Sequence, residues 1–203
     1  MNEERGRKVR SDKKRTIAAP LEENIYELVA QISYICDRPL KDIGELLCRE
    51  GIKSTKLIDT IKGKFRRDFF YEENRLYLGD LHRTPYKVKP GIQKRLYMKF
   101  YDFEHERFSQ LSYALDGSVQ AATALVLTTA MMRKDIMYPI LARFIQRDLD
   151  PKRTDQLRYL CRFLDSQNPE EYITVPAIIS YAIGQSLQNN QKIKRTLSGL
   201  FKI

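Results

Sequence analysis

The chain has 203 residues, 42% of them hydrophobic and 31% charged, which allows one sizeable hydrophobic core or two small ones. Lys and Arg (36) outnumber Asp and Glu (26), and the excess is concentrated in residues 1–15 (net +4) and 51–99 (net +8). Localised positive charge indicates a polyanionic partner, although a solvated basic face is the alternative. The three cysteines lack metal-ligand spacing, and no signal peptide or membrane-length apolar run is present, so we expect a cytoplasmic protein with no membrane partner.

The first third of the chain predicts a strand followed by two helices. Residues 1–13 are polar and aperiodic, as in a flexible basic arm. Residues 14–20 alternate between two faces, and Pro20 is expected to end the strand and open a helix. Apolar residues at spacings of three and four continue past a break at 37–39, and Gly51 is expected to cap the second helix. We assign residues 14–51 to this first unit.

Residues 52–93 predict a basic, aromatic connector. A short amphipathic helix is expected over 53–67, followed by a hairpin with its turn at Glu73-Asn74. The stretch from 80 to 91 contains two prolines and is expected to lack regular structure.

A second strand and helix pair is predicted over residues 94–135. Leu96, Met98 and Phe100 alternate with polar residues, and a break at 116–118 separates two helical patterns, with Ser118 a good N-cap. The remaining residues, 136–203, predict a C-terminal helical region with helices near 137–148, 152–166, 174–189 and 191–201.

The two predicted units share sequence. Residues 31–47 read QISYICDRPLKDIGELL, and residues 110–126, 79 positions later, read QLSYALDGSVQAATALV. The shared Q-[IL]-S-Y-x-x-D core indicates one structural module used twice.

A short strand followed by two helices across a tight turn resembles the ribbon-helix-helix family of DNA-binding proteins. The resemblance implies a mainly α fold with a short β-ribbon, in which two antiparallel strands enter the major groove of double-stranded DNA. It also implies that outward side chains read base edges and that the start of each second helix holds a phosphate. A two-stranded ribbon fits the major groove, and free N–H groups at a helix start attract phosphate.

Carried over position by position, the resemblance gives a set of DNA-binding candidates. The base-reading candidates are Lys14, Thr16 and Ala18 in the first unit and Arg95, Tyr97 and Lys99 in the second. The phosphate-binding candidates are the backbones of Leu40-Lys41 and Ser118-Val119. Ala18 departs from the pattern because it cannot hydrogen-bond a base, although it can contact a thymine methyl.

Further candidates come from charge alone. Lys62, Lys64, Arg66 and Arg67 cluster beside aromatic residues and could contact phosphate or a stacked base, although solvated residues at the edge of a core hairpin are as plausible. His82 and His105, the only histidines, lack partners at a functional spacing. We expect no catalytic residue, metal or cofactor.

The sequence therefore predicts a sequence-specific double-stranded DNA-binding protein, a transcriptional regulator or a plasmid or mobile-element maintenance factor. The alternatives are a relaxosome accessory protein at a transfer origin and a non-DNA helical interaction protein. Further partners are a second copy, or a relaxase or replication protein bound through residues 136–203. We expect the two strands to pair within one chain, with pairing between chains left open.

Overall fold

The computed structural model describes residues 14–72, 74–145 and 151–167. This part of the chain is mainly helical, with two small antiparallel sheets of two strands each. Its strands are β1 (Arg15–Glu22), β2 (Phe69–Tyr71), β3 (Arg75–Tyr77) and β4 (Gln93–Phe100). Its α-helices are α1 (Glu23–Cys36), α2 (Leu40–Lys53), α3 (Thr55–Ile61), α4 (Asp102–Ala114), α5 (Val119–Met131), α6 (Lys134–Ile145) and α7 (Pro151–Gln167).

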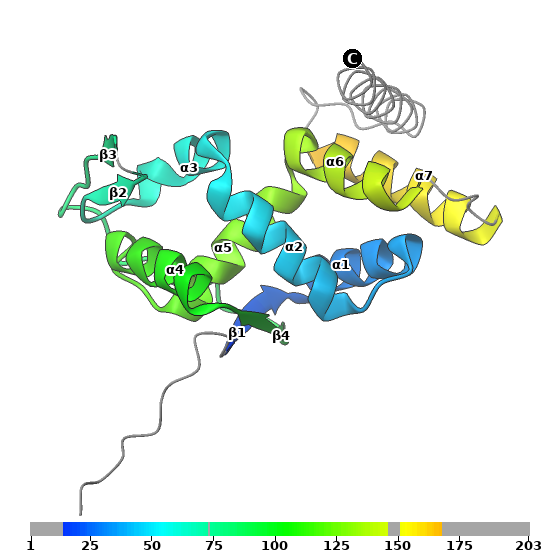
Figure 1. The fold of residues 1–203 in the computed structure, drawn as a ribbon, viewed down its shortest axis with the longest axis horizontal. Helices are drawn as coiled ribbons and strands as arrows, with labels where there is room; N and C mark the ends of the chain where they lie inside the picture. The colour runs from blue at the N-terminus through cyan, green and yellow to red at the C-terminus, as the bar shows by residue number, and fades with distance from the viewer. Residues whose placement is uncertain (1–13, 73, 146–150, 168–203) are drawn as a thin grey trace, which may run out of the picture.

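Strands β1 and β4 form an antiparallel ribbon within one chain, as the sequence predicts (Figure 1). Their register pairs Arg15 with Phe100 at one end and Glu22 with Gln93 at the other. Alternation places one side of the ribbon in the core and leaves the other side facing outward. The buried side consists of Ile17, Ala19, Leu21, Leu96, Met98 and Phe100.

The prediction that Pro20 ends the first strand is wrong. Strand β1 continues to Glu22, Pro20 lies opposite Arg95, and α1 begins only at Glu23. In a two-stranded ribbon each strand has a free edge, where a residue without an N–H costs no ladder hydrogen bond. Burial of Leu21 on the core side gives the longer strand a further apolar anchor.

The two repeats interlock around one hydrophobic core. Helix α2 of the first repeat packs against β4 of the second, α5 packs against β1, and α2 and α5 contact each other. A Cβ atom at Gly44 of α2 would lie 2.6 Å from Leu96 Cδ2, so the absence of a side chain permits this close approach. Neither repeat therefore buries its apolar face alone.

Gly51 is not the helix cap that the sequence predicts. It is buried within α2, which continues to Lys53, and a Cβ atom there would lie 2.8 Å from Val126 Cγ1 of α5. The absence of a side chain at Gly51 lets α2 and α5 pack closely together, and Gly51 does not end the helix.

The shared aspartates of the repeat end the first helix of each pair in the same way. Asp37 and Asp116 both adopt left-handed backbone conformations, with φ of 53° and 50°. The next residue then donates its N–H back to the serine of the Q-[IL]-S-Y motif, from Arg38 to Ser33 and from Gly117 to Ser112, at 3.0 Å in both cases. The sequence repeat is thus a repeat of backbone geometry.

The remaining elements lie at opposite ends of the molecule (Figure 1). Strands β2 and β3 form the predicted hairpin, which sits beside α4. Helix α6 contacts α1, α2 and α5, and α7 packs along α1. These two helices match the predicted ones near 137–148 and 152–166, whereas those at 174–189 and 191–201 lie outside the described residues, as does the arm at 1–13.

Candidate nucleic-acid interface

The outward side of the ribbon brings the candidate reading residues together. Register places Thr16 opposite Lys99 and Ala18 opposite Tyr97. Arg95, Lys99 and Thr16 are exposed, and the Tyr97 side chain is 61% exposed. A guanidinium, an ammonium and two hydroxyl groups therefore project from one surface whose reverse side is fixed in the core.

This surface is asymmetric between the two strands. Positions 79 residues apart are equivalent in the repeat, so Arg95, Tyr97 and Lys99 correspond to Thr16, Ala18 and Pro20. Strand β4 supplies two cations to the outward side of the ribbon, Arg95 and Lys99. Over the equivalent stretch of β1, from Thr16 to Pro20, the only side chain on that side that can form hydrogen bonds is Thr16. The arrangement can offer different contacts on the two sides of the ribbon.

The surface is also polarised along its length. At the Glu22 end, Lys94 pairs with Glu23 at 2.7 Å and with Glu27 at 3.5 Å. At the Arg15 end, Lys14 lies over the Tyr101 ring at 4.5 Å, and Arg15 pairs with Asp102 at 2.7 Å. Lys14 is thus exposed just before β1, at the end of the ribbon where Lys99 lies, whereas the carboxylates of Glu23 and Glu27 lie at the opposite end.

A charged network that could not be predicted from the sequence holds β4. Glu45 of α2 accepts a hydrogen bond from the backbone N–H of Lys99 at 2.9 Å, on the edge of β4 that β1 does not cover. Arg49 joins Glu45, at 3.3 Å, to Glu104, at 2.6 Å. Glu104 in turn accepts from the N–H of Tyr101 at 2.9 Å.

Both carboxylates of this network are buried, with Glu45 7% and Glu104 8% exposed. Although burial lowers the pKa of Arg49, its bonds to Glu104 and Glu45 raise that pKa above the ordinary value overall. The network fixes the backbone from which Lys99 projects. The one sign of this network in the sequence is the spacing of Glu45 and Arg49, which are four residues apart on a helix, beside its apolar stripe.

The two predicted phosphate sites lie at the starts of α2 and α5. Ser118 caps α5 as predicted, because its Oγ accepts from the N–H of Ala121 at 3.1 Å. Pro39 precedes α2 and provides no side-chain cap. Lys41 and Ser118 are exposed, while Leu40 and Val119 are half-buried.

Arg66 and Arg67 have partners within the fold. Both pair with Asp116, Arg67 at 2.6 Å, and the guanidinium of Arg67 lies 4.6 Å from the centre of the Tyr113 ring. Their backbone N–H groups both donate to the carbonyl of Ala114. These two arginines therefore fasten the connector to the second repeat, which the sequence analysis did not foresee.

The equivalent tyrosine and aspartate of the first repeat receive an arginine in the same way. Arg153 of α7 pairs with Asp37 at 3.0 Å, and its guanidinium lies 5.5 Å from the centre of the Tyr34 ring. The Y-x-x-D part of the repeat is thus an arginine-binding feature in both copies. The arginine comes from the connector in the second repeat and from α7 of the C-terminal helical region in the first.

Lys62 and Lys64 lie apart from the ribbon, in a short 3-10 segment after α3. Both are exposed. Lys62 pairs with Asp59 at 3.2 Å, and the Lys64 ammonium lies 5.9 Å from the centre of the Tyr86 ring. This exposed position fits both the phosphate or base contact and the solvated edge that the sequence predicts.

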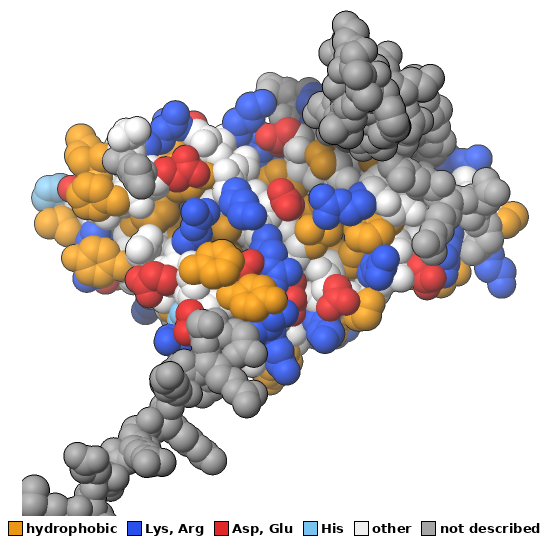
Figure 2. Space-filling view, in the orientation of Figure 1, with side chains coloured by type: hydrophobic (Ala, Val, Ile, Leu, Met, Phe, Trp, Pro, Cys, Tyr) orange, Lys and Arg blue, Asp and Glu red, His pale blue; other side chains and the backbone are white. Residues whose placement is uncertain are grey.

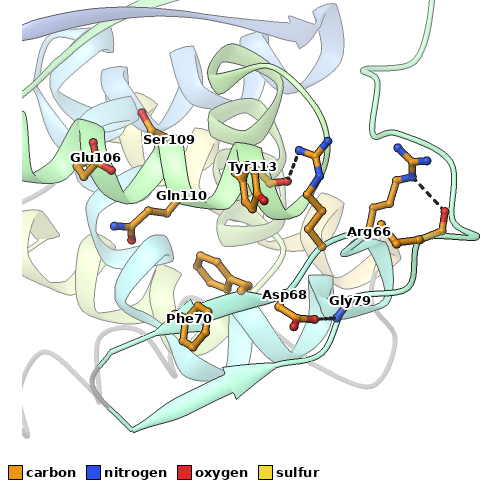
Figure 3. Close-up of a pocket in the computed structure, with 11 residues that line it drawn as sticks. Arg66, Asp68, Phe70, Gly79, Glu106, Ser109, Gln110 and Tyr113 are labelled. Atoms are coloured by element: carbon orange, nitrogen blue, oxygen red, sulfur yellow. Dashed lines mark hydrogen bonds between the residues drawn. The ribbon is translucent and has the colours of Figure 1, made fainter.

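A groove of about 910 Å³ lies between the hairpin and α4 (Figure 3). Phe70 and Tyr113 face it from opposite walls, and Arg66 and Asp68 lie at one end, where they bond the 79–81 segment. Phe70 and Leu81 are 72% and 67% exposed. Hydrophobic side chains also gather on this end of the molecular surface (Figure 2).

Residues 14–72, 74–145 and 151–167 contain no group of three His, Cys, Asp or Glu side chains that could hold a metal ion. His105 contacts Ser109 one turn along α4, and His82 is exposed. No helix among the described residues is long and apolar enough to cross a membrane. No family model, curated protein or solved structure matches the chain.

Proposed function

We propose that this protein is a sequence-specific double-stranded DNA-binding protein that reads the major groove with the β1–β4 ribbon. The observation that carries the proposal is the division of the ribbon into an apolar side buried in the core and an outward side bearing Arg95, Tyr97 and Lys99. A protruding two-stranded ribbon has the dimensions of the major groove, and an arginine or lysine pairs well with guanine acceptors.

In this proposal the two interlocked repeats act as a ribbon-helix-helix dimer made from one chain. In that arrangement the starts of α2 and α5 approach phosphates on either side of the ribbon. Exposed Lys41 and the capped N-terminus at Ser118 suit that contact. The unequal strands favour a site that is not a palindrome.

The role in the cell that we propose is transcriptional regulation or the maintenance of a plasmid or mobile element in the cytoplasm. Accessory binding at a transfer origin, with a relaxase, is a variant of the same DNA-binding function. Footprinting on the DNA upstream of the protein's own gene distinguishes autoregulation from these alternatives.

Selection from a random duplex library tests the DNA-binding proposal directly. We expect one asymmetric motif to be enriched and affinity for it to fall steeply with salt, with a slope of log K against log salt of about −0.9 per phosphate contacted. Recovery of no motif, together with salt-independent binding, would contradict the proposal.

A second candidate function, a helical interaction protein that does not act on DNA, is favoured by the groove between the hairpin and α4. Phe70 is the most exposed of its large apolar residues. The variant Phe70→Ser separates the two functions. If the ribbon is the functional surface, this variant should bind duplex DNA and act in the cell as the unmodified protein does. If the variant still binds DNA but no longer performs its role in the cell, the second function is favoured.

A further inference from the structure

Two aromatic rings stand exposed at the end of the ribbon where Lys14 and Lys99 lie. Tyr101 and Phe103, at the start of α4, are stacked with ring centroids 6.0 Å apart and planes 7° apart. Phe103 is 66% exposed and Tyr101 is 38% exposed. Within the part of the chain that the structure describes, most of the Phe103 ring therefore faces water, and the Tyr101 ring is partly covered.

Two lysines lie close to the ring pair, and exposed Glu106 follows one helical turn after Phe103. Lys14 lies over the Tyr101 ring, and Lys99 projects from β4 two residues earlier. The two carboxylates in the first turn of α4 are each held by an arginine: Asp102 by Arg15 at 2.7 Å and Glu104 by Arg49 at 2.6 Å. A polyanion could therefore approach the rings without meeting an unpaired acidic group of that turn.

The repeat shows that the fold does not require rings at these positions. The equivalents of Tyr101 and Phe103 in the first repeat are Glu22 and Asn24, both exposed, at the junction of β1 and α1. The same backbone junction is thus built with polar side chains in one copy and with stacked aromatic rings in the other. The aromatic rings therefore belong to the second repeat alone, and the backbone fold that the two repeats share does not require them.

We propose that Phe103, supported from behind by Tyr101, packs against a nucleotide of duplex DNA at the edge of the site that the ribbon occupies. This inference rests on the proposed DNA-binding function and assigns a further contact to it. In a duplex the bases are already stacked on one another, so an aromatic side chain contacts a nucleotide there by inserting an apolar wedge at a base step, as other apolar side chains do in several DNA complexes. Because only one repeat carries the rings, the protected DNA extends further on that side.

The chain contains no tryptophan, so one substitution creates a single fluorescent reporter. In Phe103→Trp, duplex carrying the selected motif should quench the emission and shield the indole from acrylamide. The matched control is Phe70→Trp on the hairpin, where a similarly exposed ring should not respond. Separately, Phe103→Ala should weaken binding to the selected duplex and shorten the protected DNA on that side, because the apolar contact with the nucleotide is lost.

The outcomes separate the inference from the function on which it rests. If labelled duplex shows by its anisotropy that both tryptophan variants bind, yet the Phe103→Trp emission and quencher access do not change, the ring contact is wrong and the DNA-binding proposal stands. An equal response from both tryptophans also overturns the contact. If the unmodified protein binds no duplex, the proposed function fails and this inference fails with it.

Discussion

Ala18 and Tyr97 lie directly opposite each other in the ribbon, and they are also equivalent positions of the repeat. Both pairs, Ala18 with Tyr97 and Gln31 with Gln110, are 79 residues apart. An antiparallel register that pairs two equivalent residues places a pseudo-twofold axis between them. The single chain therefore reproduces the symmetry of a dimer while carrying different side chains on the two halves.

The first prediction concerns this pairing in solution. Opposed residues of antiparallel strands have Cα atoms about 4.5–5.5 Å apart, which is within the range of a disulfide. Ala18→Cys combined with Tyr97→Cys should cross-link within one chain at low protein concentration, and a non-reducing gel should show monomers of altered mobility. The native thiols are buried and should not compete. Ala18→Cys alone is the control, and dimers as the main product of the double variant would contradict intrachain pairing.

The second prediction separates recognition of the base sequence from electrostatic attraction to any DNA. Arg95→Ala with Lys99→Ala should reduce preference for the selected motif over random duplex, because each lost base contact costs about 1–3 kcal/mol. Lys62→Ala with Lys64→Ala removes the same number of positive charges and, if those residues meet phosphates, should weaken binding to all sequences alike. Competition binding measures both effects. Indistinguishable behaviour of the two variants would show that β4 does not read the bases.

The third prediction concerns the support of β4. Glu45→Gln removes the buried carboxylate that holds the Lys99 N–H and pairs with Arg49. We expect a loss of about 1–3 kcal/mol in the free energy of unfolding, because a buried charge-assisted hydrogen bond is weakened and Arg49 loses a partner. Urea unfolding measures it. Glu50→Gln, an exposed change on the same helix, should cost almost nothing, and equal losses in the two variants would contradict the role of the network.

The fourth prediction concerns alkaline pH. Burial raises the pKa of the Cys36 and Cys161 thiols to about 12, and it raises that of Cys48 further. Because the folded state keeps these thiols protonated, their contribution to stability is complete below the unfolded pKa of 9.0 and is lost as the pH rises toward 12. Urea midpoints should therefore fall across this window.

A variant with all three cysteines changed to alanine isolates the thiol contribution. Cavities should make it less stable at pH 8, but its midpoint should decline less steeply above pH 9. The same decline in both proteins would assign the effect to other groups.

Periodicity and repetition in the sequence predicted the two strands and the helices that follow each strand, and they favoured antiparallel pairing within one chain, which the structure shows. Alternation of Leu96, Met98 and Phe100 is a local signal, and so is the helical spacing of α1 and α2. The cap at Ser118 and the β2–β3 hairpin were predicted from local residue types in the same way. Apart from the pairing of the two strands, which rests on the repeat, each of these features depends on residues close together along the chain.

Contacts between distant segments were decided only by the tertiary structure. Gly51 resembles a cap in the sequence, but α5 packs against it; Pro20 resembles a helix start, but the free edge of a two-stranded ribbon accommodates it. The partners of Arg67 and Arg153 at the two Y-x-x-D motifs and the bond from Glu45 to Lys99 join segments 46 or more residues apart. Residue type and spacing carry no information about which remote charge a side chain meets, because packing of the interlocked repeats determines that.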